Sequence, residues 1–138
     1  MSRDEALEEL QRRADAIEGG YELMLAYAAQ GLASDQGAAN SSQLRDHLQR
    51  FDKALTGLVQ VYRDAASVLG VWPKEALDGL LKTLEADATF TQSALRMALA
   101  QPGISSQLVD NLNASIHVRA LLTDVFVIDE LLRGAPGK

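Results

Sequence analysis

Apolar residues recur at alternating spacings of three and four along most of this chain, and this pattern limits the possible folds more than any other feature of the sequence. The spacing is typical of one face of an α-helix. Between residues 118 and 132, the most apolar run, the stripe consists of Val118, Leu121, Val125, Ile128 and Leu132. Leu122, Phe126, Val127 and Leu131 lie off that stripe, so this helix is apolar over much of its circumference. We therefore expect other helices to enclose it.

The composition favours an all-α fold. Hydrophobic residues make up 47% of the 138 residues but aromatic residues only 5%, so alanine and aliphatic side chains dominate. Alanine and leucine have high helix propensities. The length suits one domain with a substantial core, and we expect residues 1–138 to form a single unit.

Charge and residue types disfavour several classes of function. A net charge of −6 with only 13 basic residues argues against nucleic acid and anionic membrane surfaces as partners. The absence of cysteine excludes disulfides and thiolate chemistry. The apolar run contains Asp124 and Asp129 and is shorter than the roughly 20 residues that span a bilayer. Because the N-terminal residues do not have the pattern of a secretory signal, we expect a cytoplasmic protein.

Turn signals divide the chain into four helical segments of similar length, at residues 3–30, 42–69, 73–100 and 106–133. Ser2 and Glu5 have capping-box spacing at the start of the first segment. Ala33 to Ser41 forms the one long connection, and Pro136 and Gly137 lie in a short tail. Helices of this length would each be roughly 40 Å long. We expect an antiparallel up-down-up-down four-helix bundle.

A second apolar stripe on the last segment is the strongest indication of function in the sequence. It has heptad spacing but is rotated from the inner stripe, and it consists of Leu108, Leu112, Ser115, Arg119, Leu122, Phe126 and Asp129. An apolar centre with a charged rim is typical of a protein interface. We expect Leu122 and Phe126 to anchor a homodimer or another complex, with Arg119 and Asp129 fixing its register. The alternative is that the last helix is central and buries a wide arc within the monomer.

Gly19 and Gly20 interrupt the first segment, although each glycine within a helix costs roughly 1 kcal/mol relative to alanine. The heptad pattern places both on the outside and flank of that helix. They indicate either a kink or the close approach of another backbone, from a partner or a neighbouring subunit. Both glycines therefore belong to the candidate interface.

The histidines do not match the arrangements that give helical bundles catalytic activity. A di-iron centre needs a Glu-x-x-His motif on each of two helices, but Leu44 and Ala114 stand three residues before His47 and His117. Neither histidine is followed by the lysine and small residue of a histidine phosphotransfer domain. The sequence also contains no Ser-His-acid triplet and no glycine-rich phosphate loop. We therefore expect a non-enzymatic protein without a bound metal or cofactor.

Small-molecule binding is the alternative to protein binding. Tyr21 and Tyr62 occupy inner positions of the first two segments, and the third has a weakly packed level near Ala88 and Thr91. A polar pocket could form between these four residues, or the tyrosine rings could simply fill the core with their hydroxyls at the rim. The favoured hypothesis is an adaptor, assembly factor or regulator that presents helix faces to a protein partner.

Overall fold

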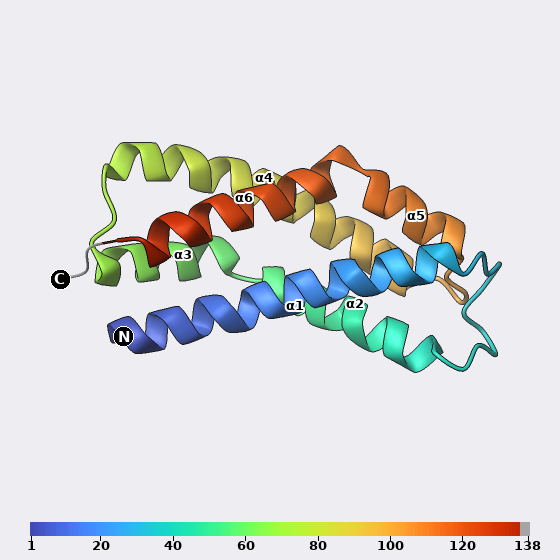
Figure 1. Cartoon of the computed structure of the whole chain (residues 1–138). Coiled ribbons are helices and arrows are strands. Elements are labelled where there is room, and N and C mark those ends of the chain that lie inside the picture. Colours follow the sequence, from blue (N-terminus) through green and yellow to red (C-terminus); the bar gives the residue numbers. More distant parts are fainter. Residues whose placement is uncertain (136–138) are drawn as a thin grey trace.

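The computed structural model describes residues 1–135, which form six α-helices and contain no strand. The helices are α1 (Arg3–Ala29), α2 (Ser41–Leu55), α3 (Leu58–Leu69), α4 (Lys74–Leu99), α5 (Ser106–Ala114) and α6 (Ile116–Arg133) (Figure 1). The predicted all-α class is therefore confirmed, while Pro136 and Gly137, expected in a tail, lie outside the described residues. Within residues 1–135, no helix is both long and apolar enough to cross a membrane.

The first and third predicted segments form single helices. The hydroxyl oxygen of Ser2 accepts a hydrogen bond from the Glu5 N–H at 3.1 Å, and the Glu5 carboxylate accepts one from the Ser2 N–H at 2.9 Å. This capping box starts α1 at Arg3, as predicted. Pro73 lies directly before α4, where its missing N–H leaves no hydrogen bond unmade.

The segment predicted as one helix over 42–69 forms two helices, so the prediction of four uninterrupted helices is wrong here. α2 ends at Leu55, and Thr56 is extended. Gly57 follows with a φ of +69°, a conformation that glycine adopts far more easily than other residues. The leucines on both sides of the break keep the heptad spacing, so the pattern predicted one continuous helix across it.

Side chains from two other helices satisfy the backbone groups at this break. Arg13 of α1 donates to the carbonyl oxygens of Ala54 and Thr56. Gln92 of α4 donates to the carbonyl oxygen of Asp52 at 3.0 Å. Carbonyl groups at the end of a helix lack partners within that helix, so these bonds stabilise the end of α2.

The segment predicted as one helix over 106–133 is also interrupted. Ser115 has an extended backbone between α5 and α6, and its hydroxyl oxygen accepts a hydrogen bond from the His117 N–H at 3.2 Å. Serine is a favoured N-cap residue. Ser115, which was predicted to lie on the second stripe of one long helix, therefore caps the start of α6 instead. The chain bends where α5 meets α6 (Figure 1).

The helices pack around one apolar core. α1 contacts α2, α3, α5 and α6, whereas α4 contacts α2, α3 and α6. The largest fully buried side chains include Tyr27, Phe51 and Tyr62. The N-terminus and the end of α6 lie at one end of the molecule, and the connections after α1 and α4 lie at the other (Figure 1).

An ion pair between buried Asp35 and partly buried Arg45 fixes the connection between α1 and α2. Asp35 is 1% exposed. Its carboxylate accepts hydrogen bonds from Arg45 Nε at 2.7 Å, from the Ser41 hydroxyl at 2.8 Å and from the Ile104 N–H at 2.7 Å. The bonds from Arg45, together with those from the Ile104 N–H and Ser41, hold the pKa of Asp35 well below its usual range. This connection is therefore tied to the start of α2 and to the segment after α4.

Candidate interaction face on α4 and α6

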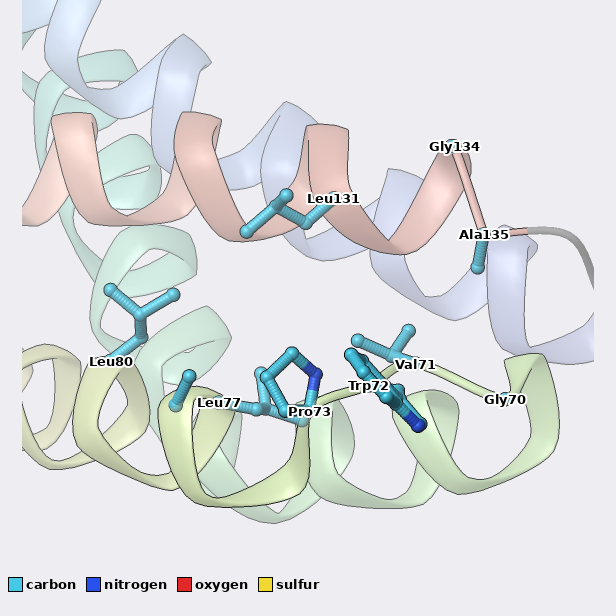
Figure 2. Close-up of a pocket in the computed structure, with 10 residues that line it drawn as sticks. Gly70, Val71, Trp72, Pro73, Leu77, Leu80, Leu131, Gly134 and Ala135 are labelled. Carbon is cyan, nitrogen blue, oxygen red and sulfur yellow. The ribbon is translucent and has the colours of Figure 1, made fainter.

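An apolar groove lies at one end of the molecule, between the α3–α4 connection and the end of α6. It has a volume of about 560 Å³ and is lined by Gly70, Val71, Trp72, Pro73, Ala76, Leu77, Leu80, Leu131, Gly134 and Ala135. Figure 2 shows Leu131 of α6 on one side of the groove and Leu80 of α4 on the other. Trp72 is 84% exposed and Leu131 is 50% exposed. Large apolar side chains left in water around a groove are typical of a binding surface.

The backbone on either side of the groove explains why Trp72 projects into water. Gly70 ends α3 with a φ of +72°, and Pro73 immediately precedes α4. The connection is therefore short, and Trp72 lies between two helix ends that are already fixed.

Two carboxyl groups lie between α4 and α6, two helical turns from the groove. Asp87 of α4 is buried, and Asp124 of α6 has a buried oxygen, Oδ2, that accepts no hydrogen bond from residues 1–135. Burial, followed by hydrogen bonding to Asp87 and by its charge, raises the pKa of Asp124 to about 7. Near neutral pH the two carboxyl groups therefore share a proton in part of the molecules, and at higher pH two negative charges lie side by side.

His117 and Phe90 continue the line of contacts between α4 and α6. His117 Nδ1 lies 3.5 Å from Asp87 Oδ1. The ring centroids of His117 and Phe90 are 4.3 Å apart, and the rings are tilted by 32°. The seam between the two helices thus passes from apolar to acidic to aromatic side chains.

These contacts fix the register of α4 against α6. Three pairs lie opposite one another: Leu80 and Leu131, Asp87 and Asp124, and Phe90 and His117. Residue numbers rise along α4 as they fall along α6, so the two helices are antiparallel. Val127 falls on the same side of α6 as Asp124 and Leu131, at spacings of three and four, and is 46% exposed.

We call this surface the α4–α6 face. It consists of Trp72, Leu80, Asp87, Phe90, His117, Asp124, Val127 and Leu131. The face includes five large apolar side chains, two carboxyl groups and one histidine, and it contains no lysine or arginine.

The second stripe predicted on the last segment is divided between core and surface. Leu112 and Leu122 are each only 9% exposed, and Leu108 is half-buried. Leu112 and Leu122 are therefore not available as surface anchors of an interface. Leu112 is covered because α5 packs against α1 and α6, and Leu122 because α6 packs against α1, α3 and α4 and buries a wide arc. Phe126, which is 51% exposed, and Arg119 remain on the surface.

Asp129, expected to fix the register of an interface, is paired within the monomer. Arg133 Nε lies 2.7 Å from Asp129 Oδ2, one turn away on the same helix. Arg133 also donates to the Gln11 side-chain oxygen of α1 at 3.0 Å. These contacts tie the end of α6 to α1.

The two adjacent glycines of α1 have different surroundings. A Cβ atom at Gly20 would lie 2.6 Å from Cδ2 of Phe51, so α1 and α2 approach one another closely there. Close packing within the monomer explains Gly20, which the heptad pattern had placed away from the core. A Cβ at Gly19 would meet no atom within 4 Å, and nothing in the structure explains that glycine.

The four residues of the predicted small-molecule pocket are dispersed. Tyr62 and Thr91 are each 1% exposed in the core, and Tyr21 is half-buried. Ala88 lines a depression of about 400 Å³ beside the α2–α3 break, and the other three residues do not line it. A different tyrosine, Tyr27, has the buried hydroxyl with a well-defined partner, a backbone carbonyl oxygen at 2.6 Å.

Several residues of the α4–α6 face carry a signal in the sequence. Asp124 interrupts the most apolar run of the chain, and charges in apolar surroundings often mark functional positions. Trp72 is the one tryptophan and stands before a proline in a turn, where binding residues are common. Asp87 lies at the polar level of the third segment. Their proximity depends on the register of α4 against α6, which no spacing within one helix encodes.

Comparisons with family models, with curated proteins and with solved structures find no match to this chain. In the part of the chain that the structure describes, no group of three His, Cys, Asp or Glu side chains is placed to hold a metal ion. The α4–α6 face is therefore the feature from which function is inferred.

Proposed function

We propose that this protein is a non-enzymatic helical-bundle protein that binds a partner protein through the α4–α6 face. One observation carries the proposal: exposed apolar side chains are concentrated on α4 and α6. Among residues 1–135, ten large apolar side chains are exposed, and eight of them lie on α4, on α6 or in the connection before α4. Five of these belong to the α4–α6 face, namely Trp72, Leu80, Phe90, Val127 and Leu131, whereas Met97, Ile116 and Phe126 lie outside it. Contiguous exposed apolar surface is uncommon on monomeric proteins and marks interaction sites.

In this proposal the six helices form an interrupted version of the antiparallel four-helix bundle. α2 and α3 together take the place of the second helix, and α5 and α6 together that of the fourth. The break at Gly57 bends the chain between α2 and α3, and the break at Ser115 bends it between α5 and α6. Neither break changes the order in which the four parts of the bundle follow one another. α4 and α6 then form one side of the bundle, and a partner helix would lie along the seam between them.

The partner is tested by comparing variants of two surfaces. Val127→Glu combined with Leu131→Glu introduces charge on the α4–α6 face, whereas Leu25→Glu introduces it at an exposed position of α1. Tagged forms of all three proteins would be captured from the source cells, and the bound proteins quantified by mass spectrometry. A partner of the α4–α6 face is retained by wild type and by Leu25→Glu and is lost from the double variant. Equal retention of that partner by all three proteins contradicts the proposal.

We also propose a cytoplasmic location for this protein. Microscopy of the tagged protein tests it.

Self-association is a second candidate, supported by Phe126. This side chain is 51% exposed on the flank of α6 away from the carboxyl pair, with Arg119 on the same flank. A homodimer through this flank would bury Phe126 against its copy. Light scattering on the wild-type protein distinguishes a dimer from a monomer.

The end groove supports small-molecule binding as a third candidate. Its volume of about 560 Å³ lies in the range of ligand sites, although the groove is open at the surface. Trp72 is the one tryptophan of the chain and lines the groove, so its fluorescence reports on occupancy. A saturable blue shift on titration with an apolar fatty acid would favour this function, and an unchanged spectrum would count against it.

A further inference from the structure

We propose that the partner segment is an amphipathic helix with one central arginine, and that this arginine binds the Asp87–Asp124 carboxyl pair while apolar residues on either side of it contact Leu80, Leu131 and Phe90. This inference rests on the proposed function, because it specifies what the α4–α6 face binds. It is carried by the charge of the face and by the spacing of its side chains.

The carboxyl pair forms no ion pair with a lysine or arginine among the described residues. Its neighbour His117 has Nδ1 3.5 Å from Asp87 Oδ1 and adds a positive charge there only when it is protonated. Asp124 Oδ2 is buried and accepts no hydrogen bond within residues 1–135. A buried carboxyl group beside a partly buried one, with no lysine or arginine between them, is unfavourable when both are ionised, so the pair is complementary to a positive charge from outside the chain.

The charged side chains on the neighbouring helices are engaged elsewhere. Asp52 of α2 pairs with Arg96 at 3.1 Å, and Arg63 of α3 pairs with Asp78 at 2.6 Å. On the other flank of α6, Arg133 pairs with Asp129 at 2.7 Å, and Glu18 of α1 lies close enough to Asp129 for the two charges to interact. None of these groups forms an ion pair with Asp87 or Asp124.

The spacing of the face specifies where the cation lies in the partner helix. Leu80 precedes Asp87 by seven residues, and Leu131 follows Asp124 by seven, so the groove lies two turns, about 10.5 Å, from the carboxyl pair. Phe90 lies three residues beyond Asp87 in the other direction. A helix along the seam therefore needs leucine-like residues about one and two turns from its arginine. Arginine suits this position because its planar guanidinium can donate to both carboxylates at once.

A second copy of this chain does not fit the face equally well. A two-fold dimer through the α4–α6 face would bring two carboxyl pairs towards one another, and the face provides no lysine or arginine to separate them. Like charges brought together across an interface oppose association. The charge of the face thus favours a basic helix of another protein.

Binding of the arginine has a measurable consequence for the shared proton. Burial and Asp87 raise the pKa of Asp124 to about 7 in the free protein. A guanidinium placed on the pair favours two ionised carboxylates, so the pair loses its proton to the buffer as the complex forms. We therefore expect affinity to rise from pH 5.5 to pH 8 and heat measurements in two buffers to detect proton release near neutral pH.

The test uses a designed helical peptide and the full chain. The probe is an alanine- and glutamine-rich peptide of about 18 residues, with a central arginine and leucines four and seven positions to either side, a length of about 27 Å. Its control replaces arginine by citrulline, which has nearly the same shape but no charge. At pH 7.5 we expect calorimetry to show binding of the arginine peptide about tenfold tighter than the citrulline peptide. Asp87→Asn combined with Asp124→Asn should remove that difference, and Leu131→Glu should weaken both peptides.

The possible results separate this inference from the proposed function. Equal binding of the two peptides to wild-type protein overturns the role of the carboxyl pair and leaves docking of a helix on the face intact. No binding of either peptide counts against helix docking itself and so against both proposals. Because the comparison of arginine with citrulline uses wild-type protein, it does not depend on the folding of any variant.

Discussion

Two acidic groups of the molecule are in opposite situations: Asp35, which is buried, and Asp124, which is partly buried. At the end formed by the connections after α1 and α4, Asp35 accepts hydrogen bonds from Arg45, Ser41 and the Ile104 N–H, and these interactions lower its pKa. Between α4 and α6, Asp124 lies beside Asp87 with no cation, and burial and that neighbour raise its pKa. The first carboxylate is favoured by the fold in its charged form, and the second is disfavoured.

This difference separates a charge that the fold pairs from one that the fold leaves without a cation. Asp35 is fully paired within the monomer, where it joins the connection after α1 to the connection after α4, and its charge needs no partner from another molecule. An acid that the monomer leaves unpaired in apolar surroundings lowers stability, and such groups are concentrated at functional sites. The four predictions that follow test this distinction in order of decreasing effect.

Removing the charge of Asp35 should have the largest effect. Asp35→Asn leaves the partly buried Arg45 without its anion, so we expect a loss of about 3 kcal/mol in the free energy of unfolding at pH 7. Because the folded-state pKa of Asp35 is lowered, its stabilisation is present above the unfolded pKa of about 4 and is lost as pH falls below it. The deficit of the variant, measured by urea denaturation, should therefore shrink in acid.

The matched control for Asp35 is Asp46→Asn in the same part of the chain. Asp46 pairs with Arg50 on the exposed side of α2, and surface pairs contribute little, so the loss should be under about 0.5 kcal/mol. Similar losses for the two variants would contradict the structural role of Asp35.

The same contrast between a filled and an open position can be tested without charge at two glycines of α1. Gly20→Ala places a methyl group 2.6 Å from the Phe51 ring carbon Cδ2, and such overpacking should lower stability by about 1–3 kcal/mol. Gly19→Ala meets no atom within 4 Å, so the better helix propensity of alanine should raise stability by up to about 1 kcal/mol. Thermal denaturation of both variants provides the measurement. Equal shifts in Tm would show that the close approach of α1 and α2 is wrong.

Removing the charge of Asp124 should stabilise the protein, in contrast to Asp35. The folded-state pKa of Asp124 is raised to about 7, so the stability of wild type falls as pH rises from about 4 to 7. Asp124→Asn should be more stable than wild type by about 1 kcal/mol at pH 8, a modest value because the partial exposure of Asp124 weakens the repulsion. The gain should disappear near pH 4. Urea denaturation of wild type, of Asp124→Asn and of the exposed control Asp110→Asn between pH 4 and pH 8 provides the test. A difference in stability between Asp124→Asn and wild type that does not change with pH would contradict the shared proton.

An exposed apolar residue outside both acidic regions should have the smallest effect on folding. Phe126 is 51% exposed, so Phe126→Asp should change the free energy of unfolding by no more than about 0.5 kcal/mol. If a homodimer forms through this flank, light scattering should show the variant as a monomer with unchanged helical content. Unfolding of the variant would instead place Phe126 in the core.

The heptad pattern predicted where helices lie but not where they are interrupted. The predicted starts of the first and third segments agree with α1 and α4 within about one residue, because a capping box and a proline mark them. The break at Gly57 was missed because apolar positions keep their spacing across it, and the break at Ser115 because Ser115 itself lies at heptad spacing between Leu112 and Leu122. A glycine or a serine at such a position can be tolerated within a helix or can end it, and the choice depends on contacts with other helices such as those of Arg13 and Gln92.

The candidate site was harder to predict than the fold for a related reason. Spacing within one helix identified Phe126 as an outer residue, but it also assigned the buried Leu122 to the same side. The spacing does not show how wide an arc of a helix its neighbours cover. The Asp87–Asp124 pair joins positions 37 residues apart. Its formation depends on the register between α4 and α6, which the packing of both helices determines together.

The network around Asp35 also determines how the molecule would respond to mechanical force. Ser106 and Leu32 reinforce it, with the Ser106 N–H donating to the Leu32 carbonyl oxygen at 2.8 Å and the Leu32 N–H donating to the Ser106 hydroxyl at 2.9 Å. These contacts lie at the end of the molecule away from both the N-terminus and the end of α6 (Figure 1). Tension between the two ends of the chain would therefore load the end with the Trp72 groove first and this network last. A partner bound across the groove would join the α3–α4 connection to α6 and strengthen the molecule where it first yields.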